Sequence, residues 1–557
     1  MHTKKRLIVD FVKKNQTEIV ASFFFGFLSI VASIFIPVFL GKYYQIALHN
    51  HSARGKIFDQ VFGNITNVKS YFIYFILLLF FKLIFDYFKK YYLGLIGELF
   101  SKSIRGQLFE KQLKIKIETH QKKEAGLYLL RYSGDLSSVQ NYLTKGIISF
   151  INDLLFLLLA ISIFAIINFK LTIILLVSYP VIFFAILYLN KILKLLSRKR
   201  RNSRSVNLAF VSTRLSALLT IKAFNREKLE TNKYAKKSED LFQLGKNYYK
   251  LYAFIYALLP CMLYALLGMI LYTAYTLNST SSDVLDGSVI LMFIMLMVNT
   301  IPALKRILSV NFIWQAGDIS FGKLLQFFNT DEEANNNVDD ISIKSGSISF
   351  KNVSFGFSDA TRVIKNMSFH IPENSLTLIN GSQQSGKSTI YKLITGLYSC
   401  KEGEVLMDNI NINLYNKHSL RKNISIVSAE FPLIGKTVFE TISYSRKSEK
   451  RIPAHNMLLK LGYTKILEND SVLDESIFEN GKNISSSQHK ILLIARALLT
   501  NKKIILLDEP FEGLDDALKE HIFNLLSELK GVHTIVVIDK NKYQSLKYDN
   551  VIDLNTC

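Results

Sequence analysis

The stretch Leu378–Ile390, LINGSQQSGKSTI, decides the fold of the second half of this 557-residue chain. A short apolar run enters a turn at Gly381, and the residues up to Ser388 then follow the spacing G-x-x-x-x-G-K-S. Apolar residues next recur at helical spacing, so the stretch reads as strand, loop and helix, which is the context that a phosphate-binding loop requires. The glycines let backbone N–H groups turn toward phosphate oxygens, and the start of the helix adds partial positive charge.

We therefore expect a nucleotide at this loop, with Lys387 at the outer phosphates and the Ser388 hydroxyl on a magnesium ion. The expected nucleotide-binding residues of the loop are Gly381, Ser382, Gln383, Gln384, Ser385, Gly386, Lys387, Ser388 and Thr389.

A second element of the same site lies further along the chain. The apolar run Ile504–Leu507 reads as a buried strand, and Asp508 and Glu509 follow it directly. An acidic pair at the mouth of such a strand suits Mg²⁺ binding by Asp508 and general-base catalysis by Glu509. Alternatively, the pair only ends a strand at a turn. Together with the loop upstream it predicts a nucleotide site with a bound Mg²⁺ ion.

Composition places the rest of the chain in a membrane. Hydrophobic residues make up 49% of the sequence, yet the formal net charge is +23. This pairing indicates a membrane protein with basic cytoplasmic parts, and the alternative of a nucleic-acid binder lacks a basic stripe interleaved with aromatic residues. The three cysteines are far apart and fit neither a disulfide framework nor a metal knuckle.

Six apolar segments in the first part of the chain are expected to cross the bilayer, two of them only with their flanks. They are Ile19–Leu40, Tyr71–Phe85, Ile147–Ile167, Leu171–Leu189, Leu251–Leu277 and Val289–Leu304. Basic residues precede the first segment, and the run Ser197–Arg204 (SRKRRNSR) follows the fourth. By the positive-inside rule, the N-terminus and the nucleotide domain are cytoplasmic, and we expect a bacterial inner or plasma membrane.

Two long polar stretches between spans, Tyr87–Gly146 and Asn190–Lys250, carry helical periodicity beyond the bilayer. Each is expected to project two helical arms into the cytoplasm, although a merely solvated charged hairpin is the alternative. After the acidic, Asn-rich stretch Asn329–Asp340, short apolar strands alternate with helices, which is typical of an α/β domain. The predicted fold is thus multi-domain: an all-α six-helix transmembrane domain with long cytoplasmic arms (residues 1–325), a linker (326–345) and an α/β P-loop ATPase domain (346–557).

With these motifs in place, the chain resembles a half-size ABC transporter of the exporter-type (type IV) membrane fold over nearly its whole length. The stretches EAGLYLLRYSGDLSSVQNYL (Glu124–Leu143) and TIKAFNREKLE (Thr220–Glu230) are similar to the arms of that family. By this likeness, the arm tips Ile117–Lys122 and Ser216–Phe224 are coupling helices that pass nucleotide-driven motion to the membrane.

The resemblance also assigns roles in the ATPase domain. Phe357 takes the place of the aromatic residue that stacks on adenine, and Gly381–Thr389 is the Walker A loop, with Gln384 where a further glycine is usual. Asp508 and Glu509 match the Walker B aspartate and the catalytic glutamate.

Three positions depart from the family pattern. The signature LSGGQ reads ISSSQ, so that Ser485, Ser486, Ser487 and Gln488 take the places that contact the nucleotide across a dimer. The magnesium-sensing glutamine falls near Ala429 or Glu430. The switch histidine falls at Asp539, where a carboxylate is expected to repel the γ-phosphate instead of hydrogen-bonding to it.

The resemblance implies an ATP-driven transporter subunit, or translocase, that works as a dimer of half-transporters, with export as the expected direction. Each ATP would lie between the Walker motifs of one subunit and the signature of the other, so a homodimer would carry the departures in both sites and hydrolyse slowly. We expect a heterodimer with a second half-transporter, although the intact Glu509 argues for the homodimer. The alternatives are a catalytically weak ATP-binding or regulatory partner and an importer of the same membrane fold. The substrate is left open as a small molecule, lipid or peptide.

One ionisable residue in the spans is a candidate for the transport path. Lys82 lies inside the second span with Asp86 one turn away, and such a residue is costly in a membrane unless it faces a cavity or a partner. It is interpreted either as a substrate contact or as an i,i+4 ion pair or a snorkelling lysine. Asn299 in the sixth span is a second candidate for the path, and Asn152 and Asp153 in the third span are weaker ones.

Overall fold

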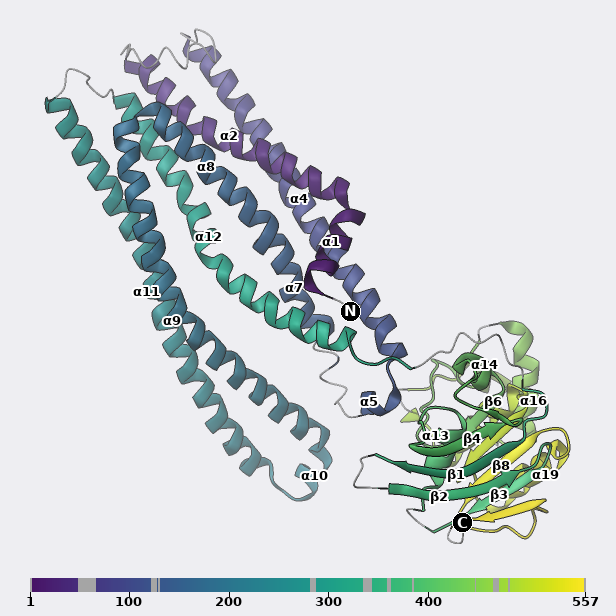
Figure 1. Ribbon diagram of the computed structural model, residues 1–557. Helices are drawn as coiled ribbons and strands as arrows, with labels where there is room; N and C mark the ends of the chain where they lie inside the picture. Colours follow the sequence, from purple (N-terminus) through teal and green to yellow (C-terminus); the bar gives the residue numbers. More distant parts are fainter. Residues whose placement is uncertain are drawn as a thin grey trace. The chain divides into compact units, whose positions relative to one another are not determined.

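The computed structural model divides into two compact units (Figure 1). The first comprises Met1–Leu113 and Glu124–Thr330, and the second comprises Lys114–Lys123 and Asp331–Cys557. The structure describes residues 3–48, 67–121, 128, 131–280, 287–333, 343–357, 362–382, 385–445, 447–463, 470–478 and 481–554.

The described part of the first unit is helical throughout. Its elements are α1 (Lys4–Lys14), α2 (Gln16–Leu48), α4 (Val68–Lys114), η1 (Arg131–Asp135), α7 (Leu136–Leu143), η2 (Thr144–Ser149), α8 (Phe150–Ile167), α9 (Phe169–Ser216), α10 (Leu218–Ala223), α11 (Glu227–Thr280) and α12 (Gly287–Phe328). Within the described residues, six helices are long and apolar enough to cross a membrane, and these six confirm the predicted spans. The last of them, α12, continues to Phe328, so the predicted linker of 326–345 begins inside a helix.

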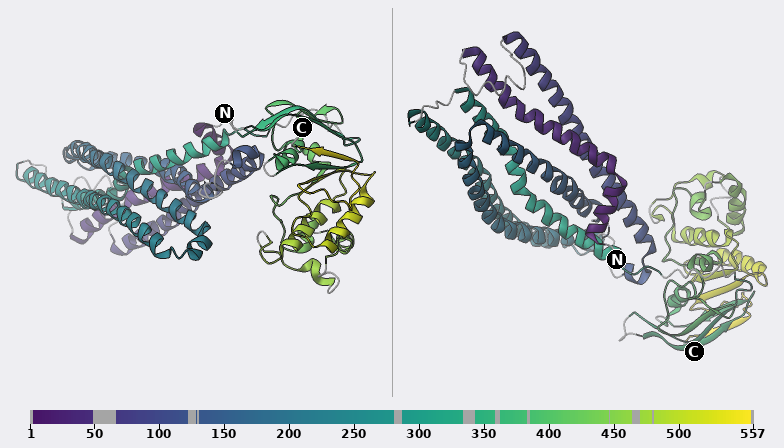
Figure 2. Two further views of the ribbon diagram at one scale, coloured as in Figure 1. Left: turned by 90° about the horizontal axis from the view of Figure 1, so that it is seen from below. Right: turned by 45° about the horizontal axis from the view of Figure 1, so that its top comes forward.

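Helices α9 and α11 form the longest antiparallel pair of this unit and run side by side in all three views (Figures 1 and 2). Asn168 caps α9, because its side chain accepts a hydrogen bond from the Leu171 N–H. Both helices extend well past their apolar segments and are joined at the far end by α10. This helix lies within the predicted tip Ser216–Phe224, and its Leu219 side chain is 84% exposed.

The core of the helical unit lies where α8, α9, α11 and α12 meet. Phe164 of α8 and Phe293 of α12 are fully buried there, with ring centroids 4.4 Å apart. By contrast, apolar side chains of α4 such as Ile76 and Leu83 are mostly exposed. A bilayer accounts for this outward apolar surface, since it is a solvent for such side chains.

The second unit contains two sheets in its described residues. An antiparallel sheet has the order β2-β1-β4-β5 and a parallel sheet the order β6-β7-β8-β3-β9. The strands are β1 (Ile348–Gly356), β2 (Arg362–Ile371), β3 (Leu376–Asn380), β4 (Glu402–Met407), β5 (Ile410–Asn411), β6 (Ile424–Val427), β7 (Ile504–Asp508), β8 (Thr534–Asp539) and β9 (Asn550–Asp553). The principal helices are α13 (Lys387–Ile394), α14 (Lys417–Lys422), α15 (Val438–Ser443), α16 (Arg451–Lys460), α18 (Ser486–Leu499) and α19 (Asp516–Leu529). Strands β7 and β8 are buried along their whole length, as expected of a parallel sheet covered on both faces.

A short helix from the first half of the chain, α5 (Ile117–Gln121), belongs to this second unit. Ile117 packs against the core beneath the antiparallel sheet, and the Glu118 carboxylate accepts a hydrogen bond of 3.4 Å from the Ser399 N–H. The Glu333 N–H donates to the Lys114 carbonyl at 2.8 Å. The predicted tip Ile117–Lys122 of the first arm is therefore anchored on the nucleotide unit through α5, while Lys122 lies outside the described residues.

Candidate functional site

Strand order brings the predicted nucleotide-binding residues to one edge of the parallel sheet. Strand β8 lies between β7 and β3, with Asp508 opposite Ile538 and Asn380 opposite Asp539. The carboxyl ends of the three strands therefore meet, and Gly381, Asp508 and Asp539 lie at that edge, where open α/β sheets bind ligands.

The phosphate-binding loop ends at Gly386, which has φ +88° and directly precedes α13. A Cβ atom there would lie 3.1 Å from Ile364, so both the backbone conformation and the close packing require glycine. Lys387 is buried, and its ammonium group donates to the carbonyls of Gly381 at 2.8 Å and Ser382 at 3.0 Å. The lysine thus lies across the loop, where it would meet phosphate oxygens. The predicted ligands Gln383 and Gln384 lie outside the described residues.

Asp508 is buried at the end of β7, and one of its two carboxylate oxygens is already engaged. Oδ2 accepts hydrogen bonds from the Ser388 hydroxyl at 3.3 Å and the Ser428 hydroxyl at 3.1 Å. Oδ1 is buried and has no hydrogen-bond partner among the described residues. Burial raises the pKa of Asp508 to about 6, and the charge of Glu509 also raises it, whereas the hydrogen bond from Ser428 lowers it. A free buried carboxylate oxygen beside a hydroxyl is a donor set that suits Mg²⁺, so the residues fit this ion.

In the nucleotide site, the sequence analysis missed Ser428, which bonds Asp508. It is the first residue after β6 and is buried. The positions expected to replace the magnesium-sensing glutamine form no hydrogen bond with Asp508 in the described structure: Ala429 is exposed and has no polar side-chain group, while exposed Glu430 pairs with Lys392 at 2.6 Å. The sequence held a signal for Ser428: it is a polar residue directly after a short apolar run, the same pattern that identified Asp508.

Glu509 has φ +47°, a left-handed conformation that is uncommon for a residue other than glycine. Its N–H donates to the Ile538 carbonyl at 2.8 Å, and its own carbonyl accepts from the Lys490 ammonium group at 2.7 Å. These two contacts offset a conformational cost of about 1–3 kcal/mol. They place the half-buried Glu509 side chain directly after Asp508, as a general base for water requires.

Asp539, at the switch position, is 2% exposed at the end of β8. One carboxylate oxygen accepts a 3.0 Å hydrogen bond from the Asn541 N–H, and the other, Oδ2, is buried with no partner in the described residues. Burial raises the pKa of Asp539, and the backbone N–H groups of Asn541 and Lys540 oppose this effect. The expected repulsion of the γ-phosphate is thus weakened, because burial favours the neutral carboxyl.

The substituted signature forms a regular helix start. Ser485 caps α18: its hydroxyl accepts from the Gln488 N–H at 3.1 Å, and the Gln488 side chain accepts from the Ser485 N–H at 3.0 Å. The Ser485 hydroxyl also lies 3.0 Å from that of Ser487. These contacts occupy the polar groups of Ser485 and Gln488 within the helix start, which is the surface expected to face a partner's nucleotide.

Phe357, the predicted adenine-stacking residue, follows β1 and has a side chain that is 57% exposed. Among the described residues, the rings of Phe355 and Tyr398 lie 5.4 and 5.7 Å from it between centroids, with nearly perpendicular planes. A mostly exposed aromatic ring suits the predicted role in stacking.

A polar pocket of about 120 Å³ in the helical unit contains one of the two predicted path residues. It is lined by Ser29, Ile30, Ser33, Lys89, Asn152, Asp153, Phe156, Asn299 and Arg306. Arg306 donates two hydrogen bonds to Asp153, at 2.6 and 2.8 Å. The Asn152 side-chain oxygen is buried with no partner among the described residues.

Lys82 is not among the residues that line this pocket. Its ammonium group donates to Asp86 at 3.1 Å and to the Ser33 hydroxyl at 2.8 Å, so the i,i+4 ion pair considered from sequence is present. Lys89, one turn after Asp86 on α4, lines the pocket instead. It forms no ion pair in the described part of the chain, although Asp153 and Asp86 are near enough to attract its charge. Sequence analysis missed Lys89 and Arg306 because both follow apolar segments and look like ordinary flanking cations.

Comparison with known proteins agrees with both units. The family model of the ABC transporter transmembrane region matches residues 19–301, and that of the ABC transporter matches residues 364–512. An ATP-dependent lipid A-core flippase of Haemophilus ducreyi is 26% identical over 472 residues, which cover 84% of this chain and 81% of the flippase. A multidrug resistance ABC transporter ATP-binding and permease protein of Lactococcus lactis is 24% identical over 449 residues, which cover 80% of this chain and 76% of that protein.

Among solved structures, a bacterial Atm1-family ABC exporter with ATP bound has the same fold. Its TM-score is 0.82 at 19% identity, and the match covers 97% of this chain and 94% of that one.

Proposed function

Since this chain belongs to the ABC transporters, as a half-size subunit with the exporter-type fold, we propose that it exports an anionic lipid from the cytoplasmic leaflet of a bacterial inner membrane. ATP-driven transport is the activity of this family, and the lipid is the finer part of the proposal. The observation that carries it is the polar pocket lined by Lys89, Asp153 and Arg306.

The charges of this pocket suit an anionic headgroup. Arg306 pairs with Asp153, whereas Lys89 forms no ion pair among the described residues, so the pocket lining holds two cations and one carboxylate. The partnerless oxygen of Asn152 belongs to an amide that can also donate hydrogen bonds to an anion. An ionisable cluster of this kind in a membrane domain is costly and usually marks a substrate path. The lipid A-core flippases among the relatives support a lipid as substrate.

The pocket lies at the level expected for entry from the cytoplasmic leaflet. Lys89 follows the second apolar segment, Asp153 lies at the start of the third, and Arg306 follows the sixth. By the positive-inside rule, the N-terminus and the nucleotide unit are cytoplasmic. With six alternating spans, these three segment ends then lie on the cytoplasmic side as well.

In the proposed mechanism, the loop N–H groups and Lys387 bind the phosphates of ATP, and the Phe357 ring stacks on adenine. Mg²⁺ would be held by the Ser388 hydroxyl and Asp508 and would neutralise phosphate charge. The Glu509 carboxylate accepts a proton from the water that attacks the γ-phosphorus. The bond between the γ-phosphorus and the bridging oxygen breaks, and ADP and phosphate are released.

We propose that two half-transporters pair to complete each site, with residues 485–488 of one chain facing the nucleotide of the other. Exposed apolar side chains at the arm tip, Leu219 and Phe224, support contact with a partner. A heterodimer remains the favoured pairing because ISSSQ, Ala429 and Asp539 would weaken both sites of a homodimer. The alternative of a catalytically weak regulatory partner is not favoured, since Asp508 and Glu509 are both present at the end of β7.

The test is transport in vesicles of phosphatidylcholine that contain fluorescent phosphatidylglycerol or fluorescent phosphatidylcholine. We expect ATP-dependent movement of the anionic lipid, reduced about tenfold in Lys89→Met through loss of a charge-assisted contact. Lys90→Met is the matched control, since Lys90 is the exposed next residue of α4 and does not line the pocket. Equal transport by the two variants, or equal movement of both lipids, would contradict the proposal.

Lys82→Met in the same assay separates the two interpretations of Lys82. Because the Lys82 charge is taken up by Asp86, we expect a smaller loss of transport than in Lys89→Met. A loss as large as that of Lys89→Met would return Lys82 to the substrate path.

A further inference from the structure

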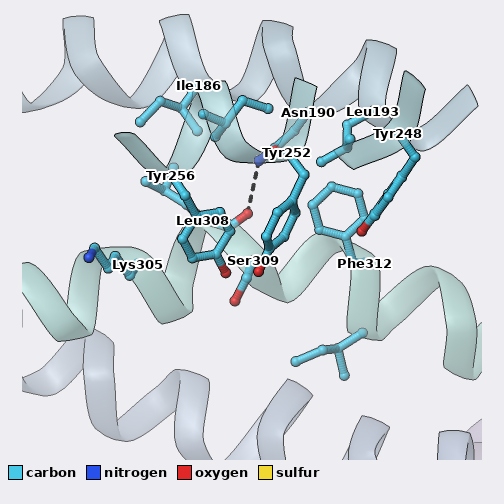
Figure 3. A pocket seen from close by; sticks show the side chains of 12 residues that line it. Ile186, Asn190, Leu193, Tyr248, Tyr252, Tyr256, Lys305, Leu308, Ser309 and Phe312 are labelled. Carbon is cyan, nitrogen blue, oxygen red and sulfur yellow. Dashed lines mark hydrogen bonds between the residues drawn. The ribbon is translucent and has the colours of Figure 1, made fainter. Parts of the chain in front are cut away.

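A second pocket in the helical unit, of about 230 Å³, lies between α9, α11 and α12 (Figure 3). It occurs where all three helices leave their apolar segments. Asn190 follows the apolar run 171–189, Tyr248 precedes the run 251–277, and Lys305 follows the run 289–304. This level corresponds to the boundary between bilayer and cytoplasm, where tyrosine and lysine side chains gather in membrane proteins.

One wall of the pocket is a ladder of tyrosines on a single face of α11. Tyr248, Tyr252 and Tyr256 follow at intervals of four residues, with successive ring centroids 5.8 and 4.3 Å apart. In Figure 3 these rings project toward α12, and Lys305 lies at the opposite end of the pocket from Tyr248. The apolar residues Ile186 and Leu193 of α9 are buried at the pocket. The cavity is thus amphipathic: its walls are aromatic and aliphatic, and the Lys305 ammonium group lies at one end.

The polar groups at the pocket are mostly donors or cations. The Asn190 amide donates to the Leu308 carbonyl at 3.0 Å, which joins α9 to α12. Lys305 is half-buried and forms no ion pair with a carboxylate in the described structure, and none of the twelve lining residues is acidic. Arg200 lies over the rings of Tyr248 and Tyr249 at 5.2 and 5.0 Å, so it adds positive charge at the tyrosine end.

We propose that this pocket binds an anionic phospholipid of the cytoplasmic leaflet, with the phosphate beside Lys305 and the glycerol and first acyl carbons against the tyrosine ladder. A hydrophobic cation would meet Lys305 with no carboxylate to neutralise it. A soluble anion would leave the aromatic and aliphatic walls without a partner, so an amphiphile fits better than either.

This lipid site is separate from the headgroup pocket of the proposed substrate. On α12, Asn299 and Arg306 are seven residues apart and share one face, whereas Lys305, Ser309 and Phe312 repeat at intervals of three and four on another. The two pockets also use different neighbours, α2, α4 and α8 for the first and α9 and α11 for the second. A lipid bound here is therefore a resident lipid that contacts the helix carrying Arg306, and the inference does not depend on which substrate is exported.

The experiment counts lipids retained by the full-length protein in native mass spectrometry, after exchange into detergent with equimolar phosphatidylglycerol and phosphatidylcholine. We expect the wild-type protein to retain phosphatidylglycerol about fivefold over phosphatidylcholine, the preference that one lysine near a membrane surface provides. Lys305→Gln is expected to lower this preference to what the pocket lined by Lys89 contributes. Lys191→Gln, an exposed cation of α9 that does not line the pocket, is expected to keep it.

Two further variants make the result specific to the pocket. Ser309→Trp fills the cavity and is expected to lower retention of both lipids. In a Lys89→Met background, which removes the contribution of the other pocket, Lys305→Gln is still expected to lower the preference. The inference is overturned if Lys305→Gln keeps the preference, if Lys191→Gln loses it to the same extent, or if tetraphenylphosphonium displaces phosphatidylglycerol from the wild-type protein.

Discussion

Replacing Ser428 by alanine tests the geometry around Asp508. The Ser428 hydroxyl provides the shorter of the two hydrogen bonds to Asp508 Oδ2, 3.1 Å against 3.3 Å from Ser388. A hydrogen bond to a charged group contributes about 1.5–3 kcal/mol. If that contribution holds Asp508 ionised and oriented for Mg²⁺, its loss lowers the apparent Mg²⁺ affinity roughly 10- to 100-fold.

The same substitution shifts the pH dependence in a direction that can be stated in advance. Burial raises the pKa of Asp508 to about 6, and the hydrogen bond from Ser428 opposes this rise. A proton on Asp508 competes with Mg²⁺, so apparent Mg²⁺ affinity falls as pH falls through this pKa. Ser428→Ala removes the opposing contribution, so the loss of affinity is expected to begin at higher pH than in the wild-type protein.

The assay is Mg²⁺ titration of ATPase activity in the reconstituted protein at several pH values. Ser425→Ala is the matched control, because Ser425 is also buried on β6 but contacts the Thr500 hydroxyl at 2.9 Å instead of Asp508. Equal Mg²⁺ midpoints and equal pH profiles in the two variants would refute the assigned role of Ser428.

Three further predictions concern the nucleotide unit. Glu509→Gln is expected to lower ATP hydrolysis about 10²- to 10⁴-fold with ATP binding retained, and near-normal hydrolysis would exclude Glu509 as the general base. Asp539→His is expected to raise hydrolysis about tenfold above an Asp539→Ala control, because an imidazole N–H can donate to the γ-phosphate and a methyl group cannot; equal rates would argue against that contact. Burial raises the pKa of Asp408, but hydrogen bonds from the Ser345 hydroxyl and from backbone N–H groups outweigh this effect and lower the pKa overall. The ionised Asp408 carboxylate therefore stabilises the fold above its unfolded pKa of about 4. This stabilisation is lost as the pH falls through the lower pKa of the folded state. Asp408→Asn should therefore lower the melting temperature at pH 7, with a difference from wild type that shrinks below about pH 4, and a pH-independent difference would contradict this reasoning.

Local chemistry made most of the fold predictable. The six spans follow from apolar runs of membrane length, and the strands Ile424–Val427 and Ile504–Leu507 from short apolar runs with polar ends. The phosphate-binding loop follows from glycine spacing, since Gly386 must adopt a positive φ at the start of α13. Each of these signals depends on neighbours within a few residues, so a single sequence carries it.

Contacts between distant residues depended on the tertiary structure. Ser428 meets Asp508 only because β6 lies beside β7, and Lys82 does not line the polar pocket but bonds Asp86 and the Ser33 hydroxyl. Arg306 meets Asp153 only because α12 packs on α8. Hydrophobic periodicity sets which face of a helix or strand is buried, but it does not set which element covers that face. Which residues of distant elements meet is therefore set by the order in which helices and strands pack, and no local sequence pattern encodes that order.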